Sequence, residues 1–281
     1  MPRAKVNDTT ISYKVQGNGE ALVLIMGLGA NKESWFMNLR TLSKHYKVIV
    51  FDSRGAGRTR DTGEPYTVRE MSEDTIGLLD YLKIEKAHFV GVSLGSLVTQ
   101  EIAIGFPQRV GKLVLAATWA LMDDAVRKED RDGKAGMPWR RGGLGDDFAQ
   151  KIINDPGSMD MDIEKTMRTF TAMSFGRRLF RIPMVLGARY YFKRGGFRGV
   201  SDQLRAVSQH NTLDRLGQIK APTLVMAGTD DKVIPIEFSR IVAERIPGAK
   251  FVEFEGGSHS FFMEMSRRFN REVLAFLSSD G

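Results

Sequence analysis

A serine between two glycines is the residue whose setting most directly suggests chemistry. Ser93 lies in Gly91-Val92-Ser93-Leu94-Gly95, after an apolar run over 88–90 and before an apolar helical pattern over 97–106. A serine on a sharp strand-to-helix turn projects its hydroxyl above the sheet, and the flanking glycines admit the close packing of such a turn. We therefore expect Ser93 to be a nucleophile, with the backbone N–H of Leu94 nearby. The alternative is an incidental serine in an ordinary strand–turn–helix.

A serine hydroxyl is a weak nucleophile until a base takes its proton, and that base is held by a carboxylate. After a serine of this kind the acid comes next along the chain and the histidine last. Of the four histidines only His259 follows the last strand-like run, in a loop of small residues over 256–260. His45 and His88 lie at positions that suit structural roles. His210, at the end of the insertion described below, is a candidate substrate contact.

The acid is expected where the preceding strand ends. The segment Gly228-Thr229-Asp230-Asp231-Lys232 follows the apolar run 224–227 and offers two carboxylates. We predict Asp231, three residues beyond Gly228, and keep Asp230 as its rival. Asp123 or Asp124 is a less favoured alternative. The aspartate that is not used is expected to stabilise the turn.

The elements that must position these residues alternate along the chain. Strand-like apolar runs occupy 21–26, 47–51, 87–91, 112–116, 222–227 and 250–254, and helical patterns occupy 68–83, 236–246 and 261–277. This alternation predicts a mostly parallel sheet covered by helices on both faces. Alternating residues over Thr10–Gln16 predict an antiparallel strand at the sheet edge.

Between Trp119 and Leu216 the apolar residues follow helical periods only. We predict a helical cap at 119–216, inserted into an α/β core of 1–118 and 217–281.

Composition removes several other classes of protein. The chain has 281 residues, 42% of them hydrophobic, and no cysteine. It therefore has no disulfide scaffold, no Cys-ligated metal and no cysteine nucleophile. Four histidines supply little for a metal centre, and we expect no metal or organic cofactor. Because no long apolar segment follows the N-terminus or is long enough to span a bilayer, a cytoplasmic protein is expected.

The formal net charge of +7 is concentrated in the predicted cap. Residues 165–198 contain nine Lys or Arg and no Asp or Glu, so the rest of the chain is slightly acidic. Seven aromatic residues lie in the same segment. We interpret it as an amphipathic lid whose aromatics line an acyl pocket, to which Trp35 and Trp119 also contribute. The alternatives are inward-facing arginines that bind a carboxylate on the substrate, or a lid that contacts a membrane surface. No nucleic-acid module is recognised, so no nucleic-acid partner is expected.

Several segments together resemble the α/β-hydrolase superfamily over nearly the whole core. They are Met26–Gly29, Asp52–Gly57, the Ser93 turn, Phe106–Val110, Pro222–Val225, Asp231 and His259. The resemblance implies an α/β-hydrolase fold with a helical cap inserted after the sixth strand, and it favours Asp231 as the acid. It also implies an oxyanion hole built from the N–H groups of Leu28 and Leu94. The superfamily usually has His where Met26 stands and Ser where Thr59 stands, so the loop carrying Leu28 is supported differently here.

A serine at the turn disfavours the dehalogenase and epoxide-hydrolase branches, which resemble this fold but need aspartate there. The leading hypothesis is a serine hydrolase that cleaves small carboxylic esters through an acyl-enzyme. One alternative is a lactonase, enol-lactonase or C–C bond hydrolase acting on an anionic substrate, to which Pro65-Tyr66-Thr67 and Leu28-Gly29 add a widely shared likeness. Another is a non-catalytic, ligand-binding member of the fold.

Overall fold

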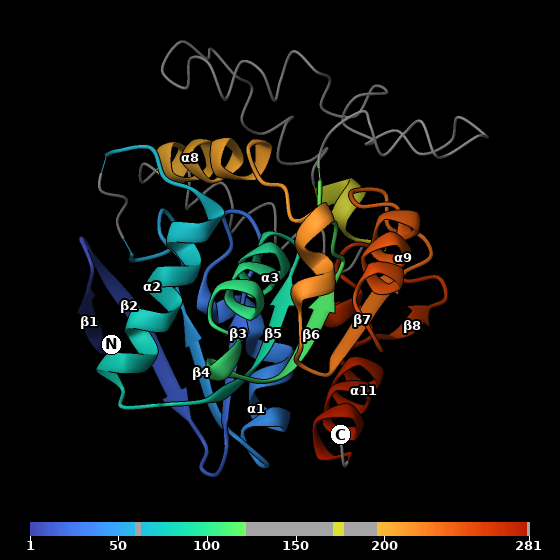
Figure 1. Cartoon of the computed structure of the whole chain (residues 1–281), viewed down its shortest axis with the longest axis horizontal. Helices are drawn as coiled ribbons and strands as arrows, with labels where there is room; N and C mark the ends of the chain where they lie inside the picture. Colours follow the sequence, from blue (N-terminus) through green and yellow to red (C-terminus); the bar gives the residue numbers. More distant parts are fainter. Residues whose placement is uncertain (60–62, 122–170, 177–195, 280–281) are drawn as a thin grey trace.

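One mixed sheet organises the molecule. The computed structural model describes residues 1–59, 63–121, 171–176 and 196–279 (Figure 1). Within these ranges eight strands pair in the order β1-β2-β4-β3-β5-β6-β7-β8. They are β1 (Arg3–Val6), β2 (Thr9–Gln16), β3 (Ala21–Ile25), β4 (Lys47–Phe51), β5 (Ala87–Val92), β6 (Val110–Ala116), β7 (Thr223–Gly228) and β8 (Lys250–Phe254). The pairs from β4 to β8 are parallel, which confirms the expected α/β architecture.

The edge of the sheet differs from the prediction. The strand expected at the edge, β2, is the second strand of the sheet. The edge strand is β1, which pairs antiparallel with β2 so that Arg3 lies opposite Ser12. Only Ala4 and Val6 of this four-residue strand are buried. So short an alternation carries almost no periodic signal, and β1 was not predicted.

Helices cover both faces of the sheet (Figure 1). The described helices are α1 (Phe36–Leu42), α2 (Val68–Tyr81), α3 (Leu94–Gly105), α8 (Gly196–Ser208), α9 (Ile236–Arg245), α10 (Phe261–Glu264) and α11 (Ser266–Ser278), with short 3-10 turns η1 (Lys32–Trp35), η2 (Pro107–Arg109) and η4 (Leu213–Gln218). The single helix predicted over 261–277 is two helices, because Met265 has non-helical backbone angles. None of the described helices is long and apolar enough to cross a membrane.

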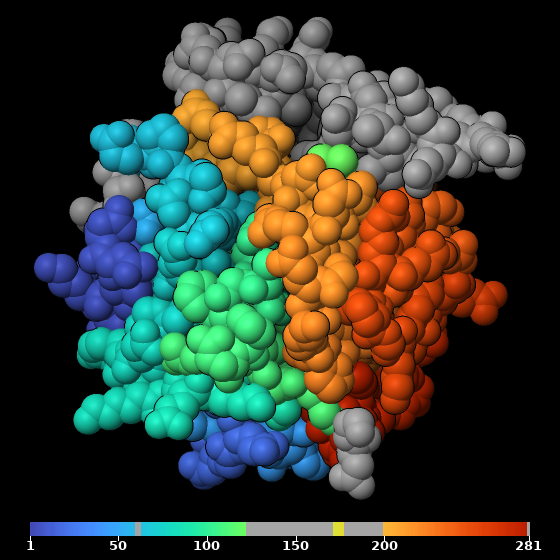
Figure 2. All heavy atoms as spheres, in the orientation of Figure 1, coloured from blue at the N-terminus to red at the C-terminus, as the bar shows by residue number. Residues whose placement is uncertain are grey.

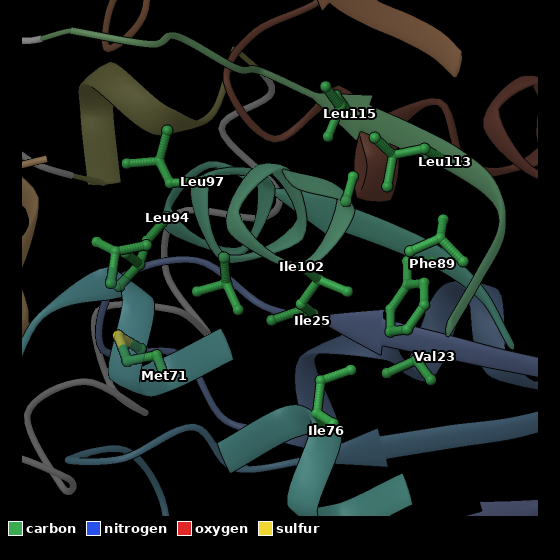
Figure 3. Close-up of a cluster of buried hydrophobic side chains, with 14 of the residues drawn as sticks. Val23, Ile25, Met71, Ile76, Phe89, Leu94, Leu97, Ile102, Leu113 and Leu115 are labelled. Atoms are coloured by element: carbon green, nitrogen blue, oxygen red, sulfur yellow. The ribbon is translucent and has the colours of Figure 1, made fainter. Parts of the chain in front are cut away.

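The side chains of the continuous apolar run of β3 belong to two hydrophobic clusters, one on each face of the sheet. Val23 and Ile25 belong to the cluster under α2, α3 and α9, whereas Leu22 and Leu24 belong to the cluster under α1 and α11. Successive side chains of a strand point to opposite faces, so a strand covered on both faces has no polar alternation. Figure 3 shows the first cluster, in which Leu94, Leu97 and Ile102 of α3 lie among side chains of β3, β5 and β6.

Much of the predicted cap lies outside the described residues. This holds for 122–170 and 177–195, hence for Asp123 and Asp124, and for the side chains of the nine basic residues in 165–198. The described ends of the insertion lie side by side, since Leu121 forms an antiparallel bridge with Asn211 and the Thr212 N–H donates to the Ala120 carbonyl at 3.0 Å. The boundaries of the cap remain a prediction.

Glycine allows α3 to begin directly on the sheet. A Cβ on Gly95 would lie 2.2 Å from the carbonyl oxygen of Ile25 in β3, and one on Gly91 would lie 2.3 Å from the carbonyl oxygen of Gly95. Backbone atoms cannot yield as a flexible side chain can. Both positions therefore require the absence of a side chain.

Adding one methyl group at Gly95 should be costly. We expect Gly95→Ala to lower the free energy of unfolding by at least about 2 kcal/mol, because the overpacked backbone of α3 and β3 must move apart. Urea titration measures this. The matched control is Gly105→Ala in the same helix, where an added Cβ meets nothing within 4 Å; it should leave stability unchanged or raise it by up to about 1 kcal/mol. Equal stability of the two variants would contradict the packing argument.

Candidate active site

Ser93 occupies a strained turn at the carboxyl end of β5. Its backbone angles are φ 55° and ψ −125°, in the positive-φ region that side-chain-bearing residues rarely adopt. The Ser93 N–H donates to the carbonyl of Ala116 at the end of β6 (3.0 Å), and its own carbonyl accepts from the Ser96 hydroxyl at 2.6 Å. These bonds tie the turn to the neighbouring strand and to the first turn of α3. The side chain lies where the sequence places it, at the end of the parallel strands.

The structure brings Asp231 to His259. The Asp231 carboxylate lies just beyond β7, and its Oδ2 is 2.8 Å from His259 Nδ1. Its other oxygen, Oδ1, accepts from the N–H groups of Val233 and Ile234, both at 2.8 Å. Asp231 and His259 are buried, whereas the rival Asp230 is exposed. The predicted acid is therefore the one that contacts the predicted histidine.

The loop that carries His259 is anchored from both sides. The Gly257 carbonyl accepts from the Asp230 N–H at 2.9 Å, which fixes the loop to the end of β7. The Ser260 N–H and the Ser258 hydroxyl donate to the Ser174 carbonyl at 2.9 and 3.0 Å. Ser174 belongs to the predicted cap, so a described piece of that insertion supports the histidine loop. No sequence motif marks this contact.

The loop after β3 lies against the serine. A Cβ added to Gly27 would be 3.0 Å from Ser93 Cβ and 3.5 Å from Ser93 Oγ. Leu28 follows Gly27 directly, and Leu94 follows Ser93 and opens α3. Both N–H groups expected to form an oxyanion hole therefore belong to segments that border the serine. Among the described residues, no group of three or more His, Asp or Glu side chains could hold a metal ion.

Residues 20–265 match the sequence model described as the alpha/beta hydrolase fold. The chain belongs to the α/β-hydrolase family. The match extends across the Ser93 turn, Asp231 and His259.

Three relatives of this α/β-hydrolase carry different names. "Putative carbamate hydrolase RutD" of Azorhizobium caulinodans is 27% identical over 281 residues, 98% of each chain. "Putative non-heme bromoperoxidase BpoC" of Mycobacterium tuberculosis is 29% identical over 280 residues, 96% of this chain and 98% of its own. The solved enol-lactonase from Burkholderia xenovorans LB400 is 26% identical with a TM-score of 0.81, covering 99% of this chain and all of its own. The chemistry named for these relatives differs from one to the next.

The three expected substrate contacts are all buried. Trp35 has no exposed surface and packs on Phe262, with 5.4 Å between ring centroids. Trp119 is 3% exposed in the core next to α3, and its carbonyl accepts from Gln100 Nε2 at 2.8 Å. His210 is buried beside α3. Contact of these residues with substrate remains a prediction.

His210 lies next to Glu101, whose charge is already paired with Arg215. His210 Nδ1 is 3.6 Å from Glu101 Oε1, and its Nε2 is 3.3 Å from Thr212 Oγ1. Arg215 binds both oxygens of Glu101, at 2.6 and 3.0 Å. Burial lowers the pKa of His210 to about 4; Glu101 opposes this shift and Arg215 adds to it. His210 is therefore neutral in the folded protein at pH 7.

This lowered pKa predicts a pH-dependent stability. Below its ordinary pKa of 6.5 the unfolded chain binds a proton at His210 that the folded chain does not bind until about pH 4. The free energy of unfolding should therefore fall as pH drops through this window, by up to about 1.4 kcal/mol per pH unit from this group. In urea titrations at pH 7.5, 6, 5 and 4.5, His210→Gln should show a shallower fall than wild type. Parallel curves would show that His210 is not the responsible group.

Proposed function

We propose that this α/β-hydrolase is a serine hydrolase that cleaves small carboxylic esters through an acyl-enzyme. The observation that carries the proposal is the buried contact of 2.8 Å between His259 Nδ1 and Asp231 Oδ2. With Nδ1 engaged by the carboxylate, Nε2 is the nitrogen that can act as a base toward a hydroxyl. The strained turn that presents Ser93 and the membership of the family support the same reading.

In the proposed reaction Ser93 Oγ attacks the ester carbonyl while His259 Nε2 takes the hydroxyl proton. Asp231 orients the imidazole and stabilises its charged form. The N–H groups of Leu28 and Leu94 stabilise the negative oxygen of the tetrahedral intermediate, and such donors are worth about 2.7–4 kcal/mol each. His259 then gives its proton to the departing alcohol. Water, activated by the same histidine, releases the acid and restores Ser93.

The lactone alternative has a specific observation in its favour. The enol-lactonase from Burkholderia xenovorans LB400 matches this chain over its full length with a TM-score of 0.81. A lactone is a cyclic ester, so the same three residues would open it by the same steps. The two proposals differ in the substrate that the cap admits: an apolar acyl chain, or an anionic ring whose carboxylate meets cap arginines.

Activity-based labelling tests the nucleophile without knowledge of the substrate. We expect wild type to react with a fluorophosphonate and to hydrolyse p-nitrophenyl esters, and Ser93→Ala to lose both activities, because no other residue supplies the attacking oxygen. A panel of acyl chain lengths, simple lactones and anionic lactones separates the two substrate classes. Preference for anionic lactones would contradict the ester proposal. The absence of both labelling and turnover in wild type would favour a non-catalytic, ligand-binding protein.

The two neighbouring aspartates provide a matched pair. Asp231→Asn should lower kcat by roughly 10⁴-fold, because the amide favours the wrong histidine tautomer and cannot stabilise its charge. Asp230→Asn makes the same chemical change one residue earlier, on an exposed side chain, and should leave kcat within about twofold of wild type. Steady-state hydrolysis of one p-nitrophenyl ester measures both. A large loss in Asp230→Asn with little loss in Asp231→Asn would reverse the assignment.

A further inference from the structure

Helix α8 of the predicted cap is seated on the two loops that follow β3 and β4. A Cβ on Gly199 would lie 1.9 Å from the carbonyl oxygen of Gly55, and one on Gly29 would lie 2.9 Å from Val200 Cγ2. The helix also packs against α2, as the space-filling view shows (Figure 2). Only a glycine at position 199 permits this approach of helix to loop backbone. The docking position of α8 is therefore sterically defined.

A fully buried glutamine of α8 bridges the two loops. Gln203 Oε1 accepts from the Gly29 N–H at 2.8 Å, and Gln203 Nε2 donates to the Arg54 carbonyl at 2.8 Å. One side-chain amide thus satisfies a donor in one loop and an acceptor in the other. A buried peptide group that is left without a partner destabilises the folded protein, so each bond constrains its loop.

The bond to Gly29 acts on the turn that contains Leu28. The Ala30 N–H donates to the Gly27 carbonyl at 3.2 Å, closing a four-residue turn with Leu28 and Gly29 at its centre. Gly29 has φ 66°, and the peptide between the two central residues is the one whose rotation changes the turn type. By accepting from the Gly29 N–H, Gln203 fixes this peptide and with it the ψ angle of Leu28. The Leu28 N–H belongs to the preceding peptide of the same turn, so it is oriented through the turn that the Ala30–Gly27 bond closes.

The second partner of Gln203 belongs to a segment that is anchored by two ion pairs. The Arg54 side chain donates to both oxygens of the buried Asp74, each at 2.9 Å, and to Asp8 at 2.7 and 3.1 Å. Farther along the first loop, the Lys32 N–H donates to Asp52 at 2.8 Å. The turn over 27–30 therefore lies between Gly27, which borders Ser93, and the bond from Lys32 to Asp52, and Gln203 joins this turn to the loop that carries Arg54.

We propose that Gln203 is a positioning residue that sets the Leu28 N–H for the oxyanion, so that docking of α8 completes the oxyanion hole. The inference rests on the proposed function, because only an acyl-transfer site uses that N–H. Gln203 itself does not touch the reacting atoms. Its effect is transmitted through the turn over 27–30.

The rate of phosphonylation measures this effect independently of the natural substrate. A fluorophosphonate reacts when Ser93 Oγ forms a bond to phosphorus, fluoride leaves and His259 takes the serine proton, and the phosphoryl oxygen gains charge in the oxyanion hole. Gln203→Met keeps the length of the side chain and removes both hydrogen bonds. We expect its second-order rate constant to fall by about 10- to 100-fold, with a matching fall in kcat for an ester and little change in KM.

The matched control is Gln16→Met. Gln16 also donates through its amide, to the Ser43 hydroxyl at 2.8 Å, but it lies opposite Val48 near the start of β4, at the other end of the strand from the site. This variant should label at the wild-type rate. Equal labelling of wild type and Gln203→Met would overturn the positioning role. No labelling of wild type would overturn the proposed function, and the positioning role with it.

A second variant separates positioning from a general loss of structure. In Gln203→Glu the introduced carboxyl is buried, which raises its pKa, and in its protonated form it can both donate to the Arg54 carbonyl and accept from the Gly29 N–H. The labelling rate of this variant relative to wild type should therefore rise as pH falls from 8 to 6, while the ratio for Gln203→Met stays flat. If Gln203→Met does not fold, the test rests on the labelling rate of Gln203→Glu relative to wild type. A relative rate that does not change between pH 8 and 6 would overturn the proposal.

Discussion

The backbone of Ser93 is held at a positive φ, a conformation that costs a residue with a side chain about 1–3 kcal/mol. The surrounding structure has to compensate for this cost. It does so through the bond from the Ser93 N–H to Ala116, the bond from Ser96 to the Ser93 carbonyl, and the contact of Gly95 with β3. The strain is thus maintained by the sheet and by α3 together. The position of the serine hydroxyl is a property of the whole core.

The residues predicted to form the site come from distant parts of the chain. The loop after β3 lies close to Ser93, the last residue of β6 accepts a hydrogen bond from the Ser93 N–H, and the His259–Asp231 pair lies beyond the ends of β7 and β8. Parallel strands make this convergence inevitable, since their carboxyl ends share one edge of the sheet. The described parts of the predicted cap then add contacts from outside the sheet, Ser174 to the histidine loop and Gln203 to the turn at Leu28.

Local patterns account for what the sequence could predict. Val23 and Ile25 pack in one core and Leu22 and Leu24 in the other, so β3 can be recognised as an unbroken apolar run. The turn at Ser93 can be recognised from the glycines on both sides of the serine. Long-range contacts explain what was missed. Gln203 forms hydrogen bonds with backbone groups of residues far earlier in the chain. Because every residue has such backbone groups, the residue types of the partners do not reveal this contact. Likewise, β1 is defined by its pairing with β2, and its own four residues show too little pattern.

The bridge between Leu121 and Asn211 brings the two ends of the insertion together at the surface of the core. A segment whose entry and exit are adjacent can be lengthened, shortened or exchanged without stretching the elements on either side. Any exchanged version of the predicted cap would have to supply again the residues that fasten it to the described loops, Gln203 among them.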